Sequence, residues 1–283
     1  MRSKLLLSAV AALAVTSASA ADLAKGKKAP PAPVVVSPWD WTVGGGLTTN
    51  YIFRGITQSD NRPSVNANAE IRYNFNDTFT GYVGTAGSSV KLTSGNAFAS
   101  PSLEWDAMGG LRGTFGAFGI DVGAVGYIYP SFTTSSATGA PFPTNTTWWE
   151  GYVKTTYAIN DMITVGVNGF ATPSYVHTGA SAQYIAGTLA VKLPMDLAFS
   201  GELGRQFIGT GDTTHGKTAY PDYTYWNAGL AYSYKIATLD LRYHDSNLSK
   251  AQCKTLTADS TPKYCNAAYV ATLSFALSAK DVK

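Results

Sequence analysis

Apolar and polar residues alternate one by one along much of this chain. In residues 64–79, SVNANAEIRYNFNDTF, every odd-numbered residue from Val65 to Phe75 is apolar, and every even-numbered residue from Asn66 to Asn76 is polar. A period of two residues is that of a β-strand, which places the two sets on opposite faces of a sheet. The pattern predicts strands, but it does not tell by itself which face meets water.

The same alternation, interrupted by turn signals, predicts an all-β chain with about twelve strands. The predicted strands span residues 39–54, 64–75, 78–90, 101–114, 117–129, 147–158, 162–172, 182–193, 196–207, 223–235, 237–245 and 267–277. The alternation is poorest in 117–129, where the apolar Val125 and Tyr127 fall on the polar face.

The connections between the predicted strands are alternately long and short. The short ones, such as Asn76-Asp77 and Pro194-Met195, have room only for tight hairpin turns. The long ones are residues 55–63, 91–100, 130–146, 173–181, 208–222 and 246–266. Short periplasmic turns, longer extracellular loops and an even number of strands are typical of outer-membrane barrels. We therefore predict a transmembrane antiparallel up-and-down barrel with a periplasmic N-terminus and every long loop outside.

Aromatic residues gather near both ends of the predicted strands. Trp41 and Phe79 represent the group near the short turns, and Trp105 and Tyr243 the group near the long loops. Two such girdles are what amphipathic rings form at the two membrane interfaces. The apolar face is therefore predicted to meet lipid and the polar face the interior. Since lipid leaves no backbone polar group hydrated, the sheet has to close.

The N-terminal sequence predicts export from the cytoplasm. Residues 1–20 begin with Arg2 and Lys4, continue with an apolar stretch and end on Ala18-Ser19-Ala20, the order of a cleaved secretory signal peptide. Residues 21–38 are rich in proline and lysine and are predicted to form a periplasmic tether. Residues 39–283 are left for the barrel, and the predicted location is the outer membrane of a Gram-negative bacterium.

Composition and charge exclude several classes of protein. The formal net charge is +3 for the whole chain and +1 without Arg2 and Lys4, with no clustered basic face that would suit a nucleic acid. After the signal peptide, no uninterrupted apolar run is long enough for a transmembrane helix. Cys253 and Cys265 lie close together in an exported chain and are predicted to form a disulfide that closes a small loop. No metal site or cofactor is expected.

Two stretches carry a resemblance to a known family. LTTNYIFRGITQSD (residues 47–60) resembles the opening of the TorF-family porins, also called the Gcw_chp domain, and HDSNLSKAQC…YC (244–265) resembles that family's ending with its two cysteines. The resemblance extends from Trp39 to about Leu277, nearly the whole mature chain. It implies an exported β-barrel that acts as a porin and interacts with outer-membrane lipid.

The polar face carries charges that would be costly against lipid, about 2–4 kcal/mol for an arginine or lysine at the membrane midplane. They are predicted to line the lumen. The set is Arg54, Glu70, Arg72, Glu104, Asp106, Arg112, Asp121, Glu150, Lys154, Lys192, Glu202, Lys235, Asp240 and Arg242. Seven of these residues are positive and seven negative, which predicts weak ion selectivity.

Two interpretations of this lumen stay open. In the first, the charges line a narrow pore for passive diffusion of small hydrophilic solutes. In the second, they form a salt-bridged plug in a structural or adhesive barrel. Eight strands usually leave a filled interior and sixteen an aqueous channel, so about twelve strands lie between the two cases.

An enzyme is the third interpretation. Tyr243-His244-Asp245-Ser246-Asn247 resembles the His-x-Ser-Asn element of outer-membrane lipid hydrolases, in which a serine nucleophile lies beside its histidine base. Such an enzyme needs both groups on the lipid-facing side, whereas His244 shares its parity with the inward-facing Asp240 and Arg242. Asn266 is the only candidate for the orienting third group. The sequence therefore favours a barrel without catalytic activity.

Overall fold

The computed structural model describes residues 37–92, 101–130, 147–213, 216–257 and 262–282. The predicted signal peptide, most of the tether and most of the loop 130–146 lie outside the described residues. None of the described helices is long and apolar enough to cross a membrane.

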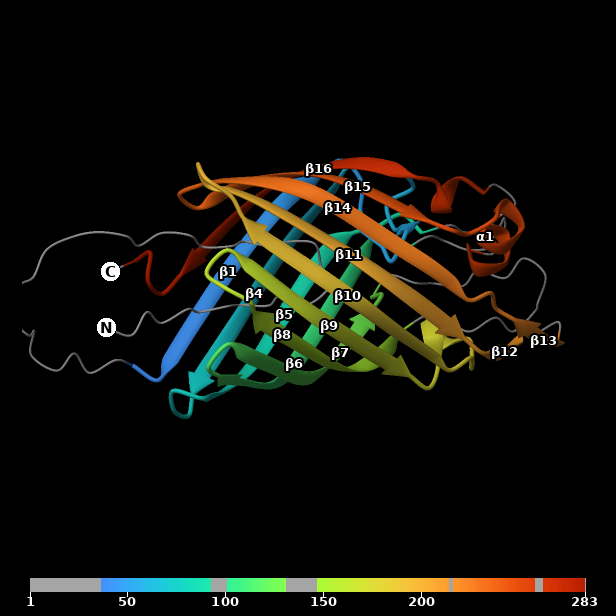
Figure 1. The fold of residues 1–283 in the computed structure, drawn as a ribbon. Helices are drawn as coiled ribbons and strands as arrows, with labels where there is room; N and C mark the ends of the chain where they lie inside the picture. The colour runs from blue at the N-terminus through green and yellow to red at the C-terminus, as the bar shows by residue number, and fades with distance from the viewer. Residues whose placement is uncertain (1–36, 93–100, 131–146, 214–215, 258–261, 283) are drawn as a thin grey trace, which may run out of the picture.

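Twelve strands form a closed antiparallel barrel in which each strand pairs with its sequence neighbours, and the prediction of this fold is confirmed (Figure 1). The strands are β1 (Trp39–Thr48), β4 (Ser64–Asn74), β5 (Phe79–Ser89), β6 (Leu103–Phe115), β7 (Phe118–Ile128), β8 (Trp148–Ala158), β9 (Ile163–Thr172), β10 (Ala182–Lys192), β11 (Leu197–Ile208), β14 (Tyr223–Tyr234), β15 (Ala237–Ser246) and β16 (Ala268–Ser278). Pairing of β1 with β16, from Thr42 opposite Ser278 to Thr48 opposite Thr272, closes the cylinder.

Local side-chain chemistry shapes the short turns. Between β4 and β5, Oδ1 of Asn76 accepts hydrogen bonds from the backbone N–H groups of Thr78 and Phe79 at 2.9 and 2.8 Å. Asn160 does the same for Met162 and Ile163 between β8 and β9. An asparagine side chain that accepts from the backbone two and three residues on substitutes for the backbone bonds of a turn. These turns therefore fix the register of their hairpins locally.

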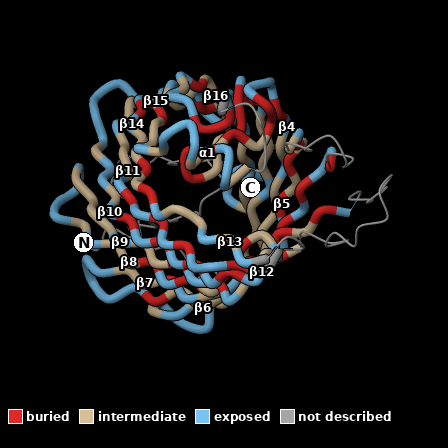
Figure 2. Tube along the Cα trace, turned by 90° about the vertical axis from the view of Figure 1, so that its right-hand side faces the viewer, coloured by how far each residue is buried: buried red, intermediate tan, exposed pale blue. Residues whose placement is uncertain are grey.

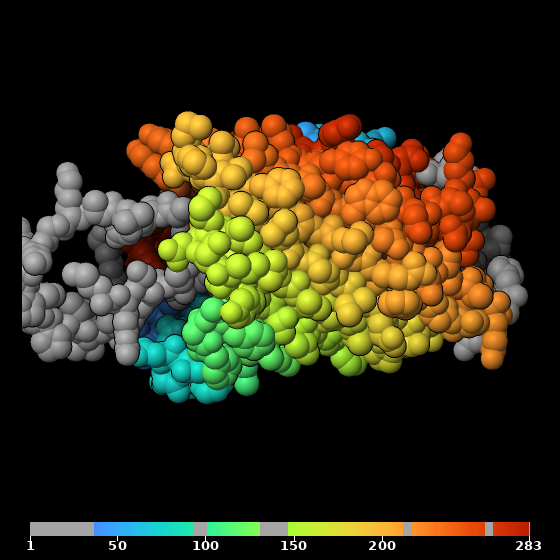
Figure 3. All heavy atoms as spheres, viewed as in Figure 1, coloured from blue at the N-terminus to red at the C-terminus, as the bar shows by residue number. Residues whose placement is uncertain are grey.

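The outer and inner faces of the barrel are opposite in character, as the parity predicts. On the outside, Val83, Leu203 and Leu111 remain 63%, 62% and 59% exposed. Figure 2 looks along the barrel from the α1 end and shows exposed and buried residues alternating along the strands. Figure 3 shows side chains covering the outer wall over β9 to β15 without a gap. A closed barrel with an apolar outer surface and charged interior is suited to lipid.

The interior is less uniformly polar than the parity predicts. Val125 and Tyr127, which break the alternation in β7, are 7% and 4% exposed and belong to a cluster of buried, mostly aromatic residues inside the barrel. Trp148 and Phe170 belong to the same cluster. These residues point inward because a folded loop fills part of the lumen and gives them an apolar partner.

That loop corrects the predicted first strand. The strand spans 39–48 rather than 39–54, and residues 49–63 fold into the barrel with a small two-stranded sheet of β2 (Ile52–Phe53) and β3 (Ile56–Thr57). Arg54 and Gly55 have φ of +45° and +83°, the left-handed conformation that reverses the chain. We call residues 52–57 the inner hairpin.

The described parts of the long connections 173–181, 208–222 and 246–266 lie at one end of the barrel, opposite the end where β1 begins and β16 finishes (Figure 1). The loop between β11 and β14 carries the hairpin of β12 (Thr210–Thr213) and β13 (Gly216–Ala219), and that between β9 and β10 carries the helix η1 (Tyr175–His177). The last one holds α1 (Lys250–Thr257) and η2 (Pro262–Cys265), with α1 at the mouth of the barrel (Figure 2).

Candidate functional site

The inner hairpin presents Arg54 to the barrel wall. The guanidinium Nη1 and Nη2 each donate to one carboxylate oxygen of Glu150 at 2.8 Å, and Nη1 also donates to Oε1 of Gln206 at 3.0 Å. Glu150 and Gln206 are completely buried and Arg54 is 4% exposed. A buried charge needs a partner with such geometry, because its desolvation is otherwise uncompensated. The ion pair therefore fixes the hairpin tip in the lumen.

Aromatic rings surround the same guanidinium. Its Cζ lies 4.7 Å from the ring centre of Phe53, 4.9 Å from that of Phe170 and 4.3 Å from that of Tyr184. Ring faces attract a planar cation, most strongly where water is excluded. These contacts place Arg54 in an aromatic cage that complements the carboxylate of Glu150.

A polar network within the loop explains the fold of the hairpin. Oδ1 of Asn50 accepts from Thr57 Oγ1 at 2.5 Å and from Ser59 Oγ at 3.0 Å. The N–H of Gln58 donates to the carbonyl of Tyr51 at 2.7 Å, and the Tyr51 hydroxyl reaches Glu104 on β6 at 2.5 Å. The stretch NYIFRGITQS thus stabilises its own turn with hydrogen bonds inside the loop, in addition to its contact with the barrel wall.

Two further predicted lumen residues lie buried near the hairpin. Glu104 accepts from the hydroxyls of Tyr51 and Tyr129, each at 2.5 Å, and is 3% exposed. Asp106, two residues along β6, is 1% exposed. The long-loop half of the interior therefore buries carboxylates beside the inner hairpin.

The short-turn half holds a chain of ion pairs that we call the ion-pair belt: Asp40, Arg72, Glu70, Arg112 and Asp121. Arg72 Nη2 lies 3.0 Å from Asp40 Oδ2, and Arg112 contacts Glu70 with two hydrogen bonds of 2.8 and 2.7 Å. Arg112 Nε donates to Asp121 at 3.1 Å. Side chains of Arg72, Glu70 and Arg112 keep 14–17% of their surface exposed. Arg72, Glu70 and Arg112 therefore keep partial contact with water, unlike Asp121, Arg54 and Glu150.

Lys154 lies between these two regions. The residue is 4% exposed, and its Nζ sits 4.0 Å from the ring centre of Tyr152 and 5.2 Å from that of Phe170. Within the described part of the chain, Nζ has no hydrogen-bond partner. The two rings are thus its nearest favourable contacts.

The other predicted lumen residues are spread along the inner wall. Arg242 binds Asp240, Asn227 and Ser200 at 2.9, 2.6 and 2.7 Å. Glu202 accepts from the Tyr184 hydroxyl. Lys192 has inward parity, but it lies at the short-turn end of β10 and its side chain is exposed.

Lys235 is a correction to the predicted set. It lies in the turn after β14 with φ of +54° and is exposed, with its Nζ 5.4 Å from the ring centre of the outward-facing Tyr234. The predicted strand 223–235 extends one residue too far, because the tight turn to β15 begins at this position.

Two residues that matter for the interior are missing from the predicted set. Asp40 pairs with Arg72, and Gln206 binds Arg54. Both positions have inward parity. Asp40 alternates with the apolar Trp39 and Trp41, and Gln206 lies four residues after Glu202 on the same strand. Alternation could have located both side chains, but not their partners.

The geometry does not form the serine–histidine pair of a hydrolase. His244 is 6% exposed inside the barrel, and its Nδ1 is 2.8 Å from the hydroxyl of Tyr225. The Ser246 Oγ has no hydrogen-bond partner among the described residues. Since both side chains share the inward parity, acyl chains of the membrane do not reach them. In the described ranges, no group of three His, Cys, Asp or Glu residues is placed to hold a metal ion.

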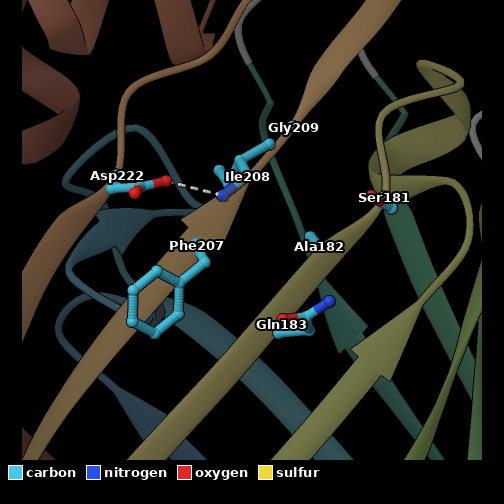
Figure 4. Close-up of a pocket in the computed structure, with 7 residues that line it drawn as sticks. All are labelled: Ser181, Ala182, Gln183, Phe207, Ile208, Gly209 and Asp222. Carbon is cyan, nitrogen blue, oxygen red and sulfur yellow. Dashed lines mark hydrogen bonds between the residues drawn. The ribbon is translucent and has the colours of Figure 1, made fainter.

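A shallow depression lies at the long-loop rim of the wall. Figure 4 shows its lining between the ends of β10 and β11, where Asp222 accepts a hydrogen bond of 2.9 Å from the N–H of Ile208. Gln183 and Ser181 complete its polar part. It contains no cluster of charged groups.

The long-loop end is held together by two kinds of cross-link. Cys253 of α1 and Cys265 of η2 form the predicted disulfide, which confirms that prediction. Asp60 at the end of loop 49–63 contacts Lys263, Arg62 and Lys91, the latter two at 3.6 Å. The disulfide restricts the loop entropy of residues 253–265, and Asp60 attaches that loop to the first one.

Acid should weaken this attachment. Burial raises the pKa of Asp60, but hydrogen bonds from Lys263 and Tyr264 and the nearby positive charges outweigh it and hold the pKa below 3.8. A carboxyl whose pKa is lowered on folding stabilises the fold above its unfolded pKa and ceases to do so as pH falls through the folded value. Amide hydrogen exchange in α1, corrected for intrinsic rates, should accelerate between about pH 5 and about pH 3. Asp60→Asn should exchange fast at both pH values, and equal protection of α1 at both in the wild type would contradict this assignment.

Comparison with known proteins places the chain among bacterial sequences. The family model described as "Bacterial protein of unknown function (Gcw_chp)" matches residues 33–277. The chain belongs to the Gcw_chp family. The predicted family resemblance is confirmed, and this Gcw_chp chain folds as a closed antiparallel β-barrel. A search of curated proteins finds no match.

Several solved channels have a similar overall barrel. The COG4313 outer membrane channel from Pseudomonas putida F1 is 11% identical, with 89% of this chain and 100% of that chain covered and a TM-score of 0.49. KdgM porin is 9% identical, with 83% and 98% covered and a TM-score of 0.46. The Pseudomonas putida toluene transporter TodX is 12% identical, with 85% and 88% covered and a TM-score of 0.46. Similarity at this level says nothing about the cargo of this Gcw_chp barrel.

Proposed function

We propose that this barrel is an outer-membrane channel for passive diffusion of small hydrophilic solutes, without catalytic activity and with a periplasmic N-terminus. The short-turn half would be its periplasmic vestibule, and the inner hairpin would be its constriction. Export by the predicted signal peptide and the even number of strands support this orientation.

The observation that carries the proposal is the difference in exposure between the two halves of the interior. Arg72, Glu70 and Arg112 of the ion-pair belt keep 14–17% of their side-chain surface exposed, whereas Arg54 and Glu150 at the hairpin are almost or completely buried. In a salt-bridged plug the interior charges would be buried throughout, as Arg54 and Glu150 are. A hydrated, charged vestibule that ends at a loop held by side chains has the parts of a narrow pore.

The revised lumen also changes the expected selectivity. Without Lys235 and with Asp40, the inward-facing charges of the described wall become six positive and eight negative. An excess of carboxylates favours cations in the channel. We therefore propose that the weak ion selectivity favours cations.

Conductance in a planar lipid bilayer tests this function. We expect discrete channel steps from the purified protein, and a shift toward stronger cation selectivity in Arg72→Ala, because the variant removes a hydrated positive charge from the vestibule. Lys235→Ala removes the same charge from an exposed turn and should conduct like the wild type. Release of fatty acid from phospholipid, abolished by Ser246→Ala, would show an enzyme instead.

The inner hairpin favours one alternative, a closed structural or adhesive barrel. If folded wild-type protein and a variant without residues 52–57 both leave the bilayer silent, the channel proposal is wrong. If only the shortened variant conducts, the barrel is a channel that the hairpin keeps closed.

A further inference from the structure

We propose that the wall around Glu150 is a binding site for a guanidinium group, which Arg54 occupies in this structure and for which basic solutes compete. The consequence of this inference for transport rests on the proposed function. It names small guanidinium-bearing cations as a class of solute that would displace the inner hairpin.

The wall residues match a planar cation in shape and in charge. Two parallel N–H···O contacts of 2.8 Å join the two terminal nitrogens of Arg54 to the two oxygens of Glu150. This bidentate arrangement suits a guanidinium and not the compact ammonium of lysine. The oxygen of Gln206 accepts a third bond at 3.0 Å, and the rings of Phe170 and Tyr184 lie at 4.9 and 4.3 Å.

The site and its occupant belong to different parts of the molecule. Glu150 is on β8, Phe170 on β9, Tyr184 on β10 and Gln206 on β11, four consecutive strands whose pairing does not involve the hairpin. The site therefore does not depend on Arg54 for its shape.

The occupant is held mainly by side chains. The backbone hydrogen bonds that the structure describes for residues 50–57 all stay within residues 48–59. Departure of the hairpin tip would thus break no rung of the barrel ladder. What it would break are the contacts of Arg54, the bond from Tyr51 to Glu104 and the apolar packing of Phe53 and Ile56 against the buried clusters.

Backbone strain gives a free ligand an advantage over Arg54. Arg54 has φ of +45°, a left-handed conformation that is unfavourable for a residue with a side chain. A free guanidinium makes the same wall contacts without this cost. The ion-pair belt carries three carboxylates and two guanidinium groups, and its net negative charge favours the approach of cations.

Titration calorimetry on Arg54→Ala in detergent micelles tests the site directly. The variant removes the resident guanidinium, and methylguanidinium is the probe. N-methylurea, which has the same shape but no charge, is the matched control ligand. We expect methylguanidinium to bind Arg54→Ala. Its affinity for the wild type should be lower by roughly tenfold or more, because Arg54 competes for the same site. N-methylurea should bind neither protein.

Two further variants locate the binding. Arg54→Ala combined with Glu150→Gln should lose the affinity for methylguanidinium, since the bidentate charged partner is gone. Arg112→Ala removes the bidentate partner of Glu70, which stays paired with Arg72 at 3.4 Å, is partly exposed and should bind the probe at least about tenfold more weakly than Glu150 does. Equal binding by Arg54→Ala and Arg112→Ala, or no binding by a folded Arg54→Ala protein, would overturn the proposal.

Bilayer recordings separate this inference from the proposed function. Methylguanidinium should increase the open time of the wild-type channel. It should leave the open time of Arg54→Ala unchanged, because this variant already lacks the ion pair with Glu150. If the wild type conducts and methylguanidinium neither binds Arg54→Ala nor alters gating, the site is wrong while the channel stands. If methylguanidinium binds Arg54→Ala but no form of the protein conducts, the site stands while the channel fails.

Discussion

Glu150→Ala should destabilise the barrel by about 3–5 kcal/mol, because it leaves the buried charge of Arg54 without its partner. Glu150 is completely buried, and in the described structure its carboxylate is the only acidic group that forms an ion pair with Arg54. The hairpin tip should then move out of the lumen, so that water can hydrate the guanidinium of Arg54. Reversible urea unfolding of the protein in lipid vesicles measures the first effect, and an increase in conductance measures the second.

Two controls separate this effect from loss of any interior carboxylate. Glu202→Ala removes a carboxylate on the same face that accepts a hydrogen bond from Tyr184, and it should cost only about 1–2 kcal/mol. The double variant Arg54→Met with Glu150→Leu should recover most of the stability, since apolar groups of similar volume often replace a buried ion pair without loss. Equal stability of Glu150→Ala and the wild type would mean that the ion pair does not hold the hairpin.

Val167→Arg should destabilise the barrel by about 2–4 kcal/mol in lipid vesicles, while the same change one residue later should be tolerated. Val167 lies in the middle of β9, and its side chain is 51% exposed on the outer face. A charge at that depth has to leave water for hydrocarbon. Urea unfolding in vesicles of the two single variants gives the comparison.

Asn168→Arg is the matched control because it adds the same side chain to the same strand on the opposite face. Asn168 has inward parity and is half-buried in the lumen, where water and carboxylates are near. We expect its free energy of unfolding to stay within about 1 kcal/mol of the wild type. If Asn168→Arg were the more damaging of the two, the assignment of the faces would be inverted.

Strand positions could be predicted from the sequence because a strand imposes its period locally. In residues 64–74 each side chain alternates between two environments, so the composition of each parity reports the environment it meets. The alternation of long and short connections is equally local, and it indicated a barrel without any knowledge of pairing. The cysteine pair could be predicted for the same reason, since the two residues are separated by only 12 positions.

The site could not be predicted in the same way. Arg54 was assigned to the lumen, but as part of a straight strand, because the extended pattern of YIFRG does not show that the chain turns inward. Its partner Glu150 is 96 residues away. Lys235 was misplaced because a strand pattern does not mark the residue at which a tight turn begins.

Most strand positions, the apolar and polar parity of most strands and the alternation of long and short connections are present in the chain alone. These properties depend on the period and on the solvent of each side chain, and both are recorded one residue at a time. The folded barrel was needed to show that the first loop enters the lumen, that Arg54 binds Glu150 and that Val125 and Tyr127 are buried inside. Those outcomes depend on distances between residues far apart in the chain, which closure of the barrel brings together.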